Sequence, residues 1–223
     1  MTVCWVEFSI TVLDGCAVAR LIHLVRHGAS SPAGDNRFFG RTDLPLTAAG
    51  EAQAQALGKL LAPLRPESIW VSPAVRAVRT AALALPQAAA RFATVPELQE
   101  VDFGRWEGKS FAQIALESPE LVRRWNDDEA DFGFPGGEPM AVYRERMRLL
   151  GQRLAEAPGD ELVAFTHGGV IRSLICQVLG LAPRHYLLFA IPTGSLTTLE
   201  LHAQLGVLRA IIPARPEDAP WRG

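Results

Sequence analysis

Cysteine is scarce in this chain of 223 residues, and its three positions argue against two kinds of chemistry. Cys4, Cys16 and Cys176 are an odd number without CxxC spacing, so a disulfide framework is not indicated. This pattern is typical of a reducing compartment, and we predict a cytoplasmic location. No cysteine is followed six positions later by arginine, which excludes a phosphatase loop built on a thiolate nucleophile.

Lysine and long apolar runs are also scarce. Lys59 and Lys109 are the only lysines among 22 basic residues. The net charge of −2 and the pI near 6.2 argue against nucleic acid or an anionic membrane as partner. No apolar run approaches the ~20 residues of a membrane span. The first twenty residues lack a basic start and contain Glu7 and Asp14, so no signal peptide is expected.

The chain is rich in apolar side chains, which make up 48% of its residues and suffice for one core. Its length fits one domain with at most a small appendage. We interpret residues 1–20 as a peripheral N-terminal extension, with an extra strand near residues 5–13 as the alternative. Residues 21–212 form the predicted domain. Residues 213–223 contain three prolines and are predicted to be a flexible C-terminal tail.

Predicted strands and helices alternate along the domain. Strands are expected at residues 21–26, 68–72, 161–166, 195–201 and 206–212. Helices are expected from the N-cap Thr47 to just before Pro63, from Pro73 to about Leu85, from the capping box at Ser110, between Glu138 and Pro158, and over 170–179. This alternation predicts an α/β fold with a parallel sheet.

Two of these strands end on histidine followed by glycine. Arg26, His27 and Gly28 close the first, and His167 and Gly168 follow the strand at 161–166. Parallel strands end at the same edge of a sheet, where open α/β sheets bind ligands, so the two histidines are expected to converge. We interpret His27 as a nucleophile and Arg26 as a phosphate-holding group, with Gly28 supplying backbone freedom for a sharp turn. The other histidines are interpreted as structural: His23, His185 and His202.

An arginine lies early in the second predicted helix. Arg76 is about one turn into this helix, where a guanidinium can combine with the helix amino end to hold an anion. Arg79 lies on nearly the same face. We hold two interpretations of Arg79 as equal: a role in the site, and a surface arginine that pairs with solvent or carboxylates.

Six motifs together resemble the histidine phosphatase superfamily, in the branch with cofactor-dependent phosphoglycerate mutase and small-molecule phosphatases. They are LVRHG (24–28), GRTDLPLT (40–47), SPAVRAVRTA (72–81), LQEVDFGRWEG (98–108), FPGGE (134–138) and THGGVIR (166–172). The likeness extends over residues 21–200. It implies a three-layer α/β/α sandwich with a mostly parallel central sheet.

The resemblance also implies roles for individual residues. His27 would be transiently phosphorylated, with Arg26, Arg76 and His167 lining the phosphate pocket and Glu100 as proton donor. Chemistry alone does not choose Glu100 over Glu97, Asp102 and Glu107, which we interpret as structural or solvated. The further substrate-binding candidates are Ser30 and Gly168.

These roles form a coherent mechanism. A neutral imidazole attacks phosphorus and gives a phosphohistidine. The arginines, with His167 if it is protonated, offset charge on the phosphoryl oxygens. Glu100 protonates the leaving oxygen and then accepts a proton from water, and we expect it to be partly buried beside Phe103 or Trp106. No metal and no cofactor is expected, because the histidines lack metal-ligand spacing.

Two positions depart from the family pattern. Many members have glutamate directly after the arginine–histidine–glycine triplet and asparagine a few residues later. Ala29 and Ala33 occupy these places here. Ser30 or backbone amides are the predicted replacement for the lost phosphate contact.

Three functions stay open: a phosphomonoesterase, a phosphoglycerate mutase-type phosphotransferase, and a phosphate-binding or regulatory module. Hydrolysis is favoured, because no long insertion precedes His167 and lysines for carboxylate recognition are few. Residues 40–43 and 103–108 look most like the α-ribazole phosphatase group of cobalamin synthesis. We predict a metal-independent histidine-type acid phosphatase acting on a small-molecule phosphate ester, with α-ribazole 5′-phosphate as candidate. Loops 29–43 and 100–138 are expected to set specificity, and a homodimer stays open.

Overall fold

The computed structural model describes residues 20–31, 35, 37–202 and 206–215. The predicted extension up to residue 19, Ala33 and the predicted tail beyond residue 215 lie outside the described residues. Within the described ranges, no helix is both long and apolar enough to cross a membrane.

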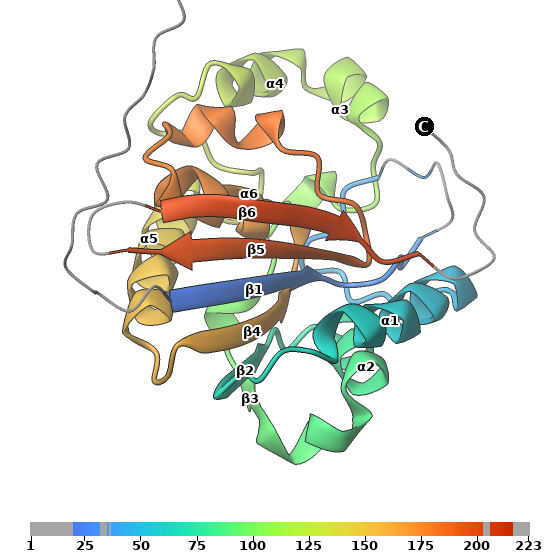
Figure 1. Ribbon diagram of the computed structural model, residues 1–223. Helices are drawn as coiled ribbons and strands as arrows, with labels where there is room; N and C mark the ends of the chain where they lie inside the picture. Colours follow the sequence, from blue (N-terminus) through green and yellow to red (C-terminus); the bar gives the residue numbers. More distant parts are fainter. Residues whose placement is uncertain (1–19, 32–34, 36, 203–205, 216–223) are drawn as a thin grey trace, which may run out of the picture.

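A six-stranded sheet lies at the centre, in the order β3-β2-β4-β1-β5-β6 (Figure 1). Its strands are β1 (Arg20–Arg26), β2 (Ser68–Val71), β3 (Phe92–Thr94), β4 (Glu161–Thr166), β5 (Ser195–Leu201) and β6 (Gly206–Pro213). The pairs β1–β4, β4–β2 and β2–β3 are parallel, and β5 and β6 add antiparallel beyond β1. The mostly parallel sheet is therefore confirmed.

The register of β1 and β4 brings two strand ends side by side. Arg26 pairs with Thr166, so the next residues along each chain segment are His27 and His167. The predicted convergence of the two histidines follows directly from this pairing.

Helices cover both faces of the sheet. The α-helices are α1 (Ala48–Leu61), α2 (Val75–Ala84), α3 (Phe111–Glu117), α4 (Pro119–Asn126), α5 (Met140–Glu156) and α6 (Gly168–Val178). Short 3₁₀ turns are η1 (Pro86–Arg91), η2 (Pro96–Leu98), η3 (Gly104–Trp106) and η4 (Pro183–Leu188). Helices α1 and α2 pack on one face and α5 and α6 on the other, which makes the predicted three-layer sandwich (Figure 1).

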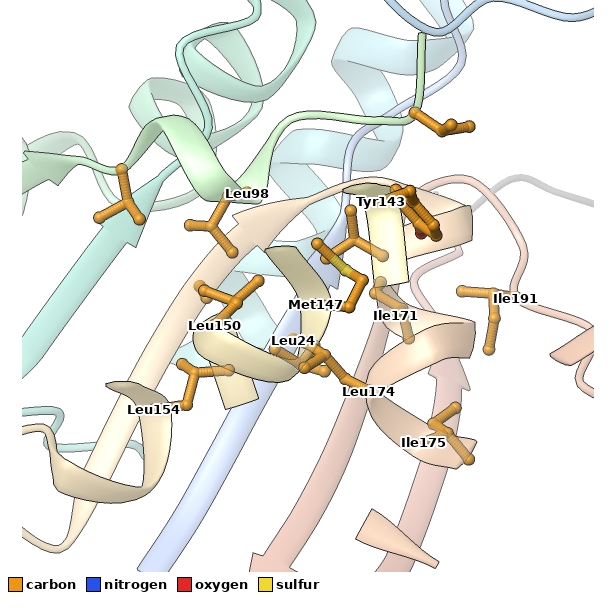
Figure 2. Packing of buried hydrophobic residues seen from close by; sticks show 14 of the residues in the cluster. Leu24, Leu98, Tyr143, Met147, Leu150, Leu154, Ile171, Leu174, Ile175 and Ile191 are labelled. Atoms are coloured by element: carbon orange, nitrogen blue, oxygen red, sulfur yellow. The ribbon is translucent and has the colours of Figure 1, made fainter. Parts of the chain in front are cut away.

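The period-2 alternation of strand side chains separates the two apolar layers. Val25 and Phe165 belong to the cluster with α1 and α2, whereas Leu24 and Ala164 belong to the cluster with α5 and α6. Figure 2 shows Leu24 beneath side chains of α5 and α6. The buried α5 residues are those on the predicted face: Tyr143, Met147, Leu150 and Leu154.

Local capping explains where α1, α2 and α3 begin. The Thr47 side chain accepts from the Gly50 N–H, and the Ser110–Gln113 capping box forms as predicted. Helix α2 begins at Val75 rather than Pro73, and the Asp43 carboxylate accepts the Val75 N–H at 2.9 Å.

Other boundaries and elements differ from the prediction. Helix α6 begins at Gly168, not residue 170, and Pro213 belongs to β6 rather than to the tail. Helix α4 and strand β3 were not predicted, and β3 has only three residues, two of them exposed.

The expected role of Gly28 is wrong. Gly28 is not among the glycines with positive φ, so it supplies no unusual backbone conformation. A Cβ there would lie 2.2 Å from the carbonyl oxygen of Gly50, and a Cβ on Gly50 would lie 2.0 Å from that of Ala29. Glycine is needed because the backbone after β1 packs directly against the first turn of α1.

Candidate active site

His27 lies directly beyond β1 and is buried. Its Nδ1 is 2.7 Å from the carbonyl oxygen of Gly28, which can only accept, so the ring proton is on Nδ1. Nε2 therefore carries a lone pair, and the Nε–H of Arg76 donates to it at 3.2 Å. Burial, with Arg76 and Arg26 nearby, holds the pKa of His27 well below its ordinary value. His27 is thus a neutral imidazole with its unprotonated nitrogen facing an arginine.

His167 is the N-cap residue of α6, and its ring centroid is 5.1 Å from that of His27. Its Nε2 is 2.8 Å from Oγ of Ser72, which also accepts the N–H of Ala74. Either partner can donate in this bond, and when the Ser72 hydroxyl donates to Nε2 the proton of neutral His167 is on Nδ1. That atom is buried and has no hydrogen-bond partner among the described residues. Burial, followed by His27, Arg76 and Arg26, lowers the pKa of His167 well below its ordinary value.

Two arginines supply the positive charge of the site. Arg76 is 1% exposed, and its terminal amines donate to the carbonyls of Gly40 at 2.6 Å and Thr42 at 3.0 Å. Arg26 donates to the carbonyl of Ile191, while its buried Nε has no partner among the described residues. Burial lowers the pKa of Arg26 to about 10, so both groups remain cationic at neutral pH.

Gly168 allows the first turn of α6 to approach this charge. A Cβ on Gly168 would lie 3.2 Å from the guanidinium carbon of Arg26. The backbone of α6 therefore lies against Arg26, and the helix amino end adds its partial positive charge to the same place.

Glu100 is buried, with 9% of its surface exposed. Its carboxylate accepts the N–H of Gly169 at 2.9 Å, at the start of α6. Arg146 of α5 holds the segment before Glu100, since it donates to the carbonyls of Glu97 at 2.8 Å and Gln99 at 2.7 Å. Glu100 thus occupies a fixed place beside the start of α6, the helix that follows His167.

A cavity of about 290 Å³ adjoins Glu100 and Gly169. Its lining mixes charged, polar and apolar side chains, and it includes six aromatic residues: Phe38, Phe103, Trp125, Phe134, Tyr143 and Tyr186. Several of these rings contact one another edge to face, for example Phe38 and Phe103 with centroids 5.0 Å apart. The ion pair of Asp128 and Arg144 also lines the cavity. Glu100 and Phe103 line it together, and Glu100 is more deeply buried than the partial burial expected beside Phe103 or Trp106.

Two candidates from the sequence make no hydrogen bond to this cluster in the part of the chain that the structure describes. Arg79 pairs with Glu51 at 2.8 Å and is half exposed, so it is a surface residue. Ser30 is half-buried in the loop after β1, and among the described residues no hydrogen bond joins it to the other site residues. Its role as a phosphate contact stays a prediction.

The family model for the histidine phosphatase superfamily (branch 1) matches residues 22–212 of this chain. The chain belongs to this superfamily. The match contains every strand and helix around the site, including both histidine-bearing strand ends.

Relatives of this superfamily member include proteins with different names. The adenosylcobalamin/alpha-ribazole phosphatase of Escherichia coli K12 is 28% identical over 84% of this chain and 93% of its own. A protein of Salmonella paratyphi C named probable phosphoglycerate mutase GpmB is 29% identical over 72% of this chain and 75% of its own. The crystal structure of the alpha-ribazole phosphatase from Shigella flexneri superposes with a TM-score of 0.76, at 26% identity, over 91% of this chain and 100% of that one.

The candidate site also contains residues that the sequence did not indicate. Ser72 orients His167, and Arg146 holds the segment before Glu100. Ser72 directly follows β2, so the strand-end argument used for the histidines could have found it. Arg146 carried no such signal, because only the packing of α5 reveals its acceptors. The cavity draws on α5, α6 and η4 as well as on the loops expected to set specificity.

Proposed function

We propose that this protein is a metal-independent phosphomonoesterase that works through a phosphohistidine on His27. The observation that carries the proposal is the tautomer of His27. Its Nδ1–H is bound to the Gly28 carbonyl, so Nε2 is the nucleophilic atom and faces Arg76 at 3.2 Å. The lowered pKa keeps this imidazole neutral without an external base.

The phosphoryl group would occupy the space among Arg26, Arg76 and His167. Two buried nitrogens, Arg26 Nε and His167 Nδ1, lack partners among the described residues, and a phosphoryl oxygen would satisfy them. The guanidinium groups would offset the charge on the equatorial oxygens in a buried, low-dielectric site.

The reaction then proceeds in two displacements. In the first, Arg76 Nε–H turns from His27 Nε2 to a phosphoryl oxygen, and the freed lone pair of Nε2 forms an N–P bond while the ester P–O bond breaks and Glu100 gives a proton to the leaving oxygen. In the second, Glu100 accepts a proton from water as the water oxygen attacks phosphorus and the N–P bond breaks. Phosphate leaves and neutral His27 is restored.

The leaving alcohol would enter the aromatic cavity next to Glu100. With a volume of about 290 Å³ and six aromatic rings in its wall, the cavity suits a planar leaving group larger than a small diacid. This preference, together with relatives named as alpha-ribazole phosphatases, supports α-ribazole 5′-phosphate as the substrate and hydrolysis over a mutase reaction.

The test is a hydrolysis panel in the presence of a metal chelator. It contains p-nitrophenyl phosphate, α-ribazole 5′-phosphate, phosphoserine and 3-phosphoglycerate. We expect turnover without metal, the highest kcat/KM for α-ribazole 5′-phosphate, and a phosphorylated peptide containing His27 after a rapid non-acidic quench.

Other outcomes would overturn parts of this proposal. Isomerisation of 3-phosphoglycerate faster than its hydrolysis would indicate a mutase. No turnover of any ester, with inorganic phosphate still bound, would indicate a binding module. Phosphate on a residue other than His27 would disprove the assigned nucleophile.

A further inference from the structure

Glu107 gathers backbone N–H groups from two segments of the site. Its carboxylate accepts from Gly40 at 3.0 Å, from Arg41 at 2.9 Å and from Thr42 at 3.2 Å. It also accepts the N–H of Phe103 at 3.3 Å. The side chain is half-buried and does not line the cavity. With both oxygens engaged by the backbone, Glu107 is placed to hold the chain rather than to touch a substrate.

The opposite side of the same loop faces Arg76. The carbonyl of Gly40 accepts from Nη2 of Arg76 at 2.6 Å, and that of Thr42 accepts from Nη1 at 3.0 Å. Arg76 in turn donates from Nε to His27 Nε2. An unbroken set of hydrogen bonds therefore joins Glu107 to the nucleophile.

One peptide group makes this connection rigid. The carbonyl of Gly40 and the N–H of Arg41 belong to the same planar trans peptide, in which they point in opposite directions. Glu107 holds the N–H end and Arg76 is held by the carbonyl end. If the N–H end were released, this peptide could rotate, and the acceptor of Arg76 would turn away with it.

The loop has little room to find another position. A Cβ on Gly40 would lie 1.9 Å from the carbonyl oxygen of Val101, so the loop packs directly on the residue after Glu100. At its far end, Asp43 accepts the N–H of Val75 and anchors the start of α2. Residues 40–42 thus bind Arg76 through their carbonyls, while their N–H groups are held by Glu107 on the other side.

We propose that Glu107 is a positioning residue for Arg76: by fixing the backbone of residues 40–42, it aims the guanidinium at the phosphoryl group and at His27. This rests on the proposed function, in which Arg76 binds the phosphoryl group. Glu107 takes no part in proton transfer.

A double-mutant cycle tests this link. Glu107→Leu is made alone and together with Arg76→Ala, and kcat for p-nitrophenyl phosphate is measured. Misaiming of a catalytic group costs about 10- to 100-fold in rate, so Glu107→Leu should lower kcat by that factor. In the Arg76→Ala background the same change should have little further effect, because the group it positions is gone. Glu107→Gln, which keeps one acceptor oxygen, should recover part of the activity.

A matched control separates positioning from stability. Glu161 also accepts a loop N–H, that of Arg65, at the opposite end of β4. Glu161→Leu should lower Tm while kcat stays near the wild-type value. The proposal is wrong if Glu107→Leu lowers Tm only, or if its loss of kcat is equally large without Arg76.

The same double-mutant cycle can be measured by phosphate binding instead of by catalysis. Calorimetric Kd values for inorganic phosphate should rise in Glu107→Leu, but not further in the Arg76→Ala background. A wild-type protein that binds phosphate without hydrolysing esters would disprove the proposed function, while this binding cycle would still decide the role of Glu107. If Glu107→Leu raised the Kd for phosphate equally in the wild-type and the Arg76→Ala backgrounds, Glu107 would not act through Arg76, and the proposed positioning role would be wrong.

Discussion

The two ends of the site differ in what fixes their side chains. At the phosphate end, His27, Arg76 and His167 are buried and each is oriented by hydrogen bonds to Gly28, the 40–42 loop or Ser72. At the cavity end, aromatic rings from separated segments contact one another edge to face. Hydrogen bonds impose one geometry, whereas apolar packing tolerates exchange of similar shapes. In the proposed reaction, the phosphate end therefore suits chemistry that is the same for every ester, and the cavity end suits an alcohol that can differ between esters.

The largest expected effect is at the nucleophile. His27→Ala should lower kcat/KM by roughly 10⁴-fold or more, as for other catalytic nucleophiles, and by the same factor for every ester. The measurement is kcat/KM for p-nitrophenyl phosphate and α-ribazole 5′-phosphate. His23 is a matched control, because it is a buried β1 histidine bound to Thr198 and Glu161. His23→Gln should keep the activity. A loss that depends strongly on the ester would contradict a shared phosphohistidine step.

Glu100 lies where the two ends meet, so its effect should depend on the alcohol. Loss of a general acid costs about 10²- to 10⁴-fold, and the cost falls when the leaving group needs no proton. Glu100→Gln should therefore be severe for an alkyl phosphate and mild for p-nitrophenyl phosphate. Glu97, which pairs with Arg153 on the surface, provides the control Glu97→Gln, expected to be near wild type. If Glu100→Gln lowered the rate equally for the alkyl phosphate and for p-nitrophenyl phosphate, Glu100 would not be the general acid.

The difference between the ends also explains how far the sequence could predict the site. His27, His167 and Arg76 each follow a strand end or a helix start, and parallel pairing brings such positions together. Local patterns therefore sufficed for their placement, although their chemical roles stay proposals. Arg79 shares the pattern of Arg76, and only its pairing with Glu51 shows that it points elsewhere.

The cavity could not be predicted in this way. Trp125 lies on α4, which was not predicted, and Tyr186 lies in η4, yet both line the same space. The sequence pattern does not predict which aromatic side chains meet in the cavity. Their meeting depends on how segments far apart in the chain, such as α4 and η4, are placed in the fold. Glu107 is similar: it was interpreted as structural or solvated, and its four backbone donors are visible only in the folded chain.

Acid should destabilise the folded chain through its buried histidines, among them His27 and His167 of the phosphate end. His27 and His167 have pKa values well below 6.5 when folded, whereas the unfolded chain titrates near 6.5. Below about pH 6.5 the unfolded chain binds more protons, so the free energy of unfolding falls as pH falls. The decline is up to about 1.4 kcal/mol per pH unit for each histidine, and the stability is fully present above pH 6.5.

Urea unfolding at pH 7.5 and pH 5 measures this decline. His167→Gln should reduce it by the share of one histidine, while the exposed His202 serves as control in His202→Gln. Saturating inorganic phosphate should also reduce the decline, because an anion favours the protonated rings. If the free energy of unfolding fell by the same amount in the wild type and in His167→Gln, the lowered pKa assigned to His167 would be wrong.

The smallest expected effect is at the cavity wall, and it sharpens the comparison most. An aromatic contact contributes about 0.5–1.5 kcal/mol, so Trp125→Ala should raise KM roughly 2- to 10-fold for α-ribazole 5′-phosphate. It should leave kcat and the KM of a small alkyl phosphate nearly unchanged, because the phosphate end keeps its hydrogen bonds. Phe111, half exposed on α3 and outside the cavity, gives the control Phe111→Ala. If Trp125→Ala instead lowered kcat equally for all esters, the cavity wall and the phosphate end would be coupled through Glu100. A substitution in the cavity that altered the preferred alcohol would then also alter the rate of the chemical step.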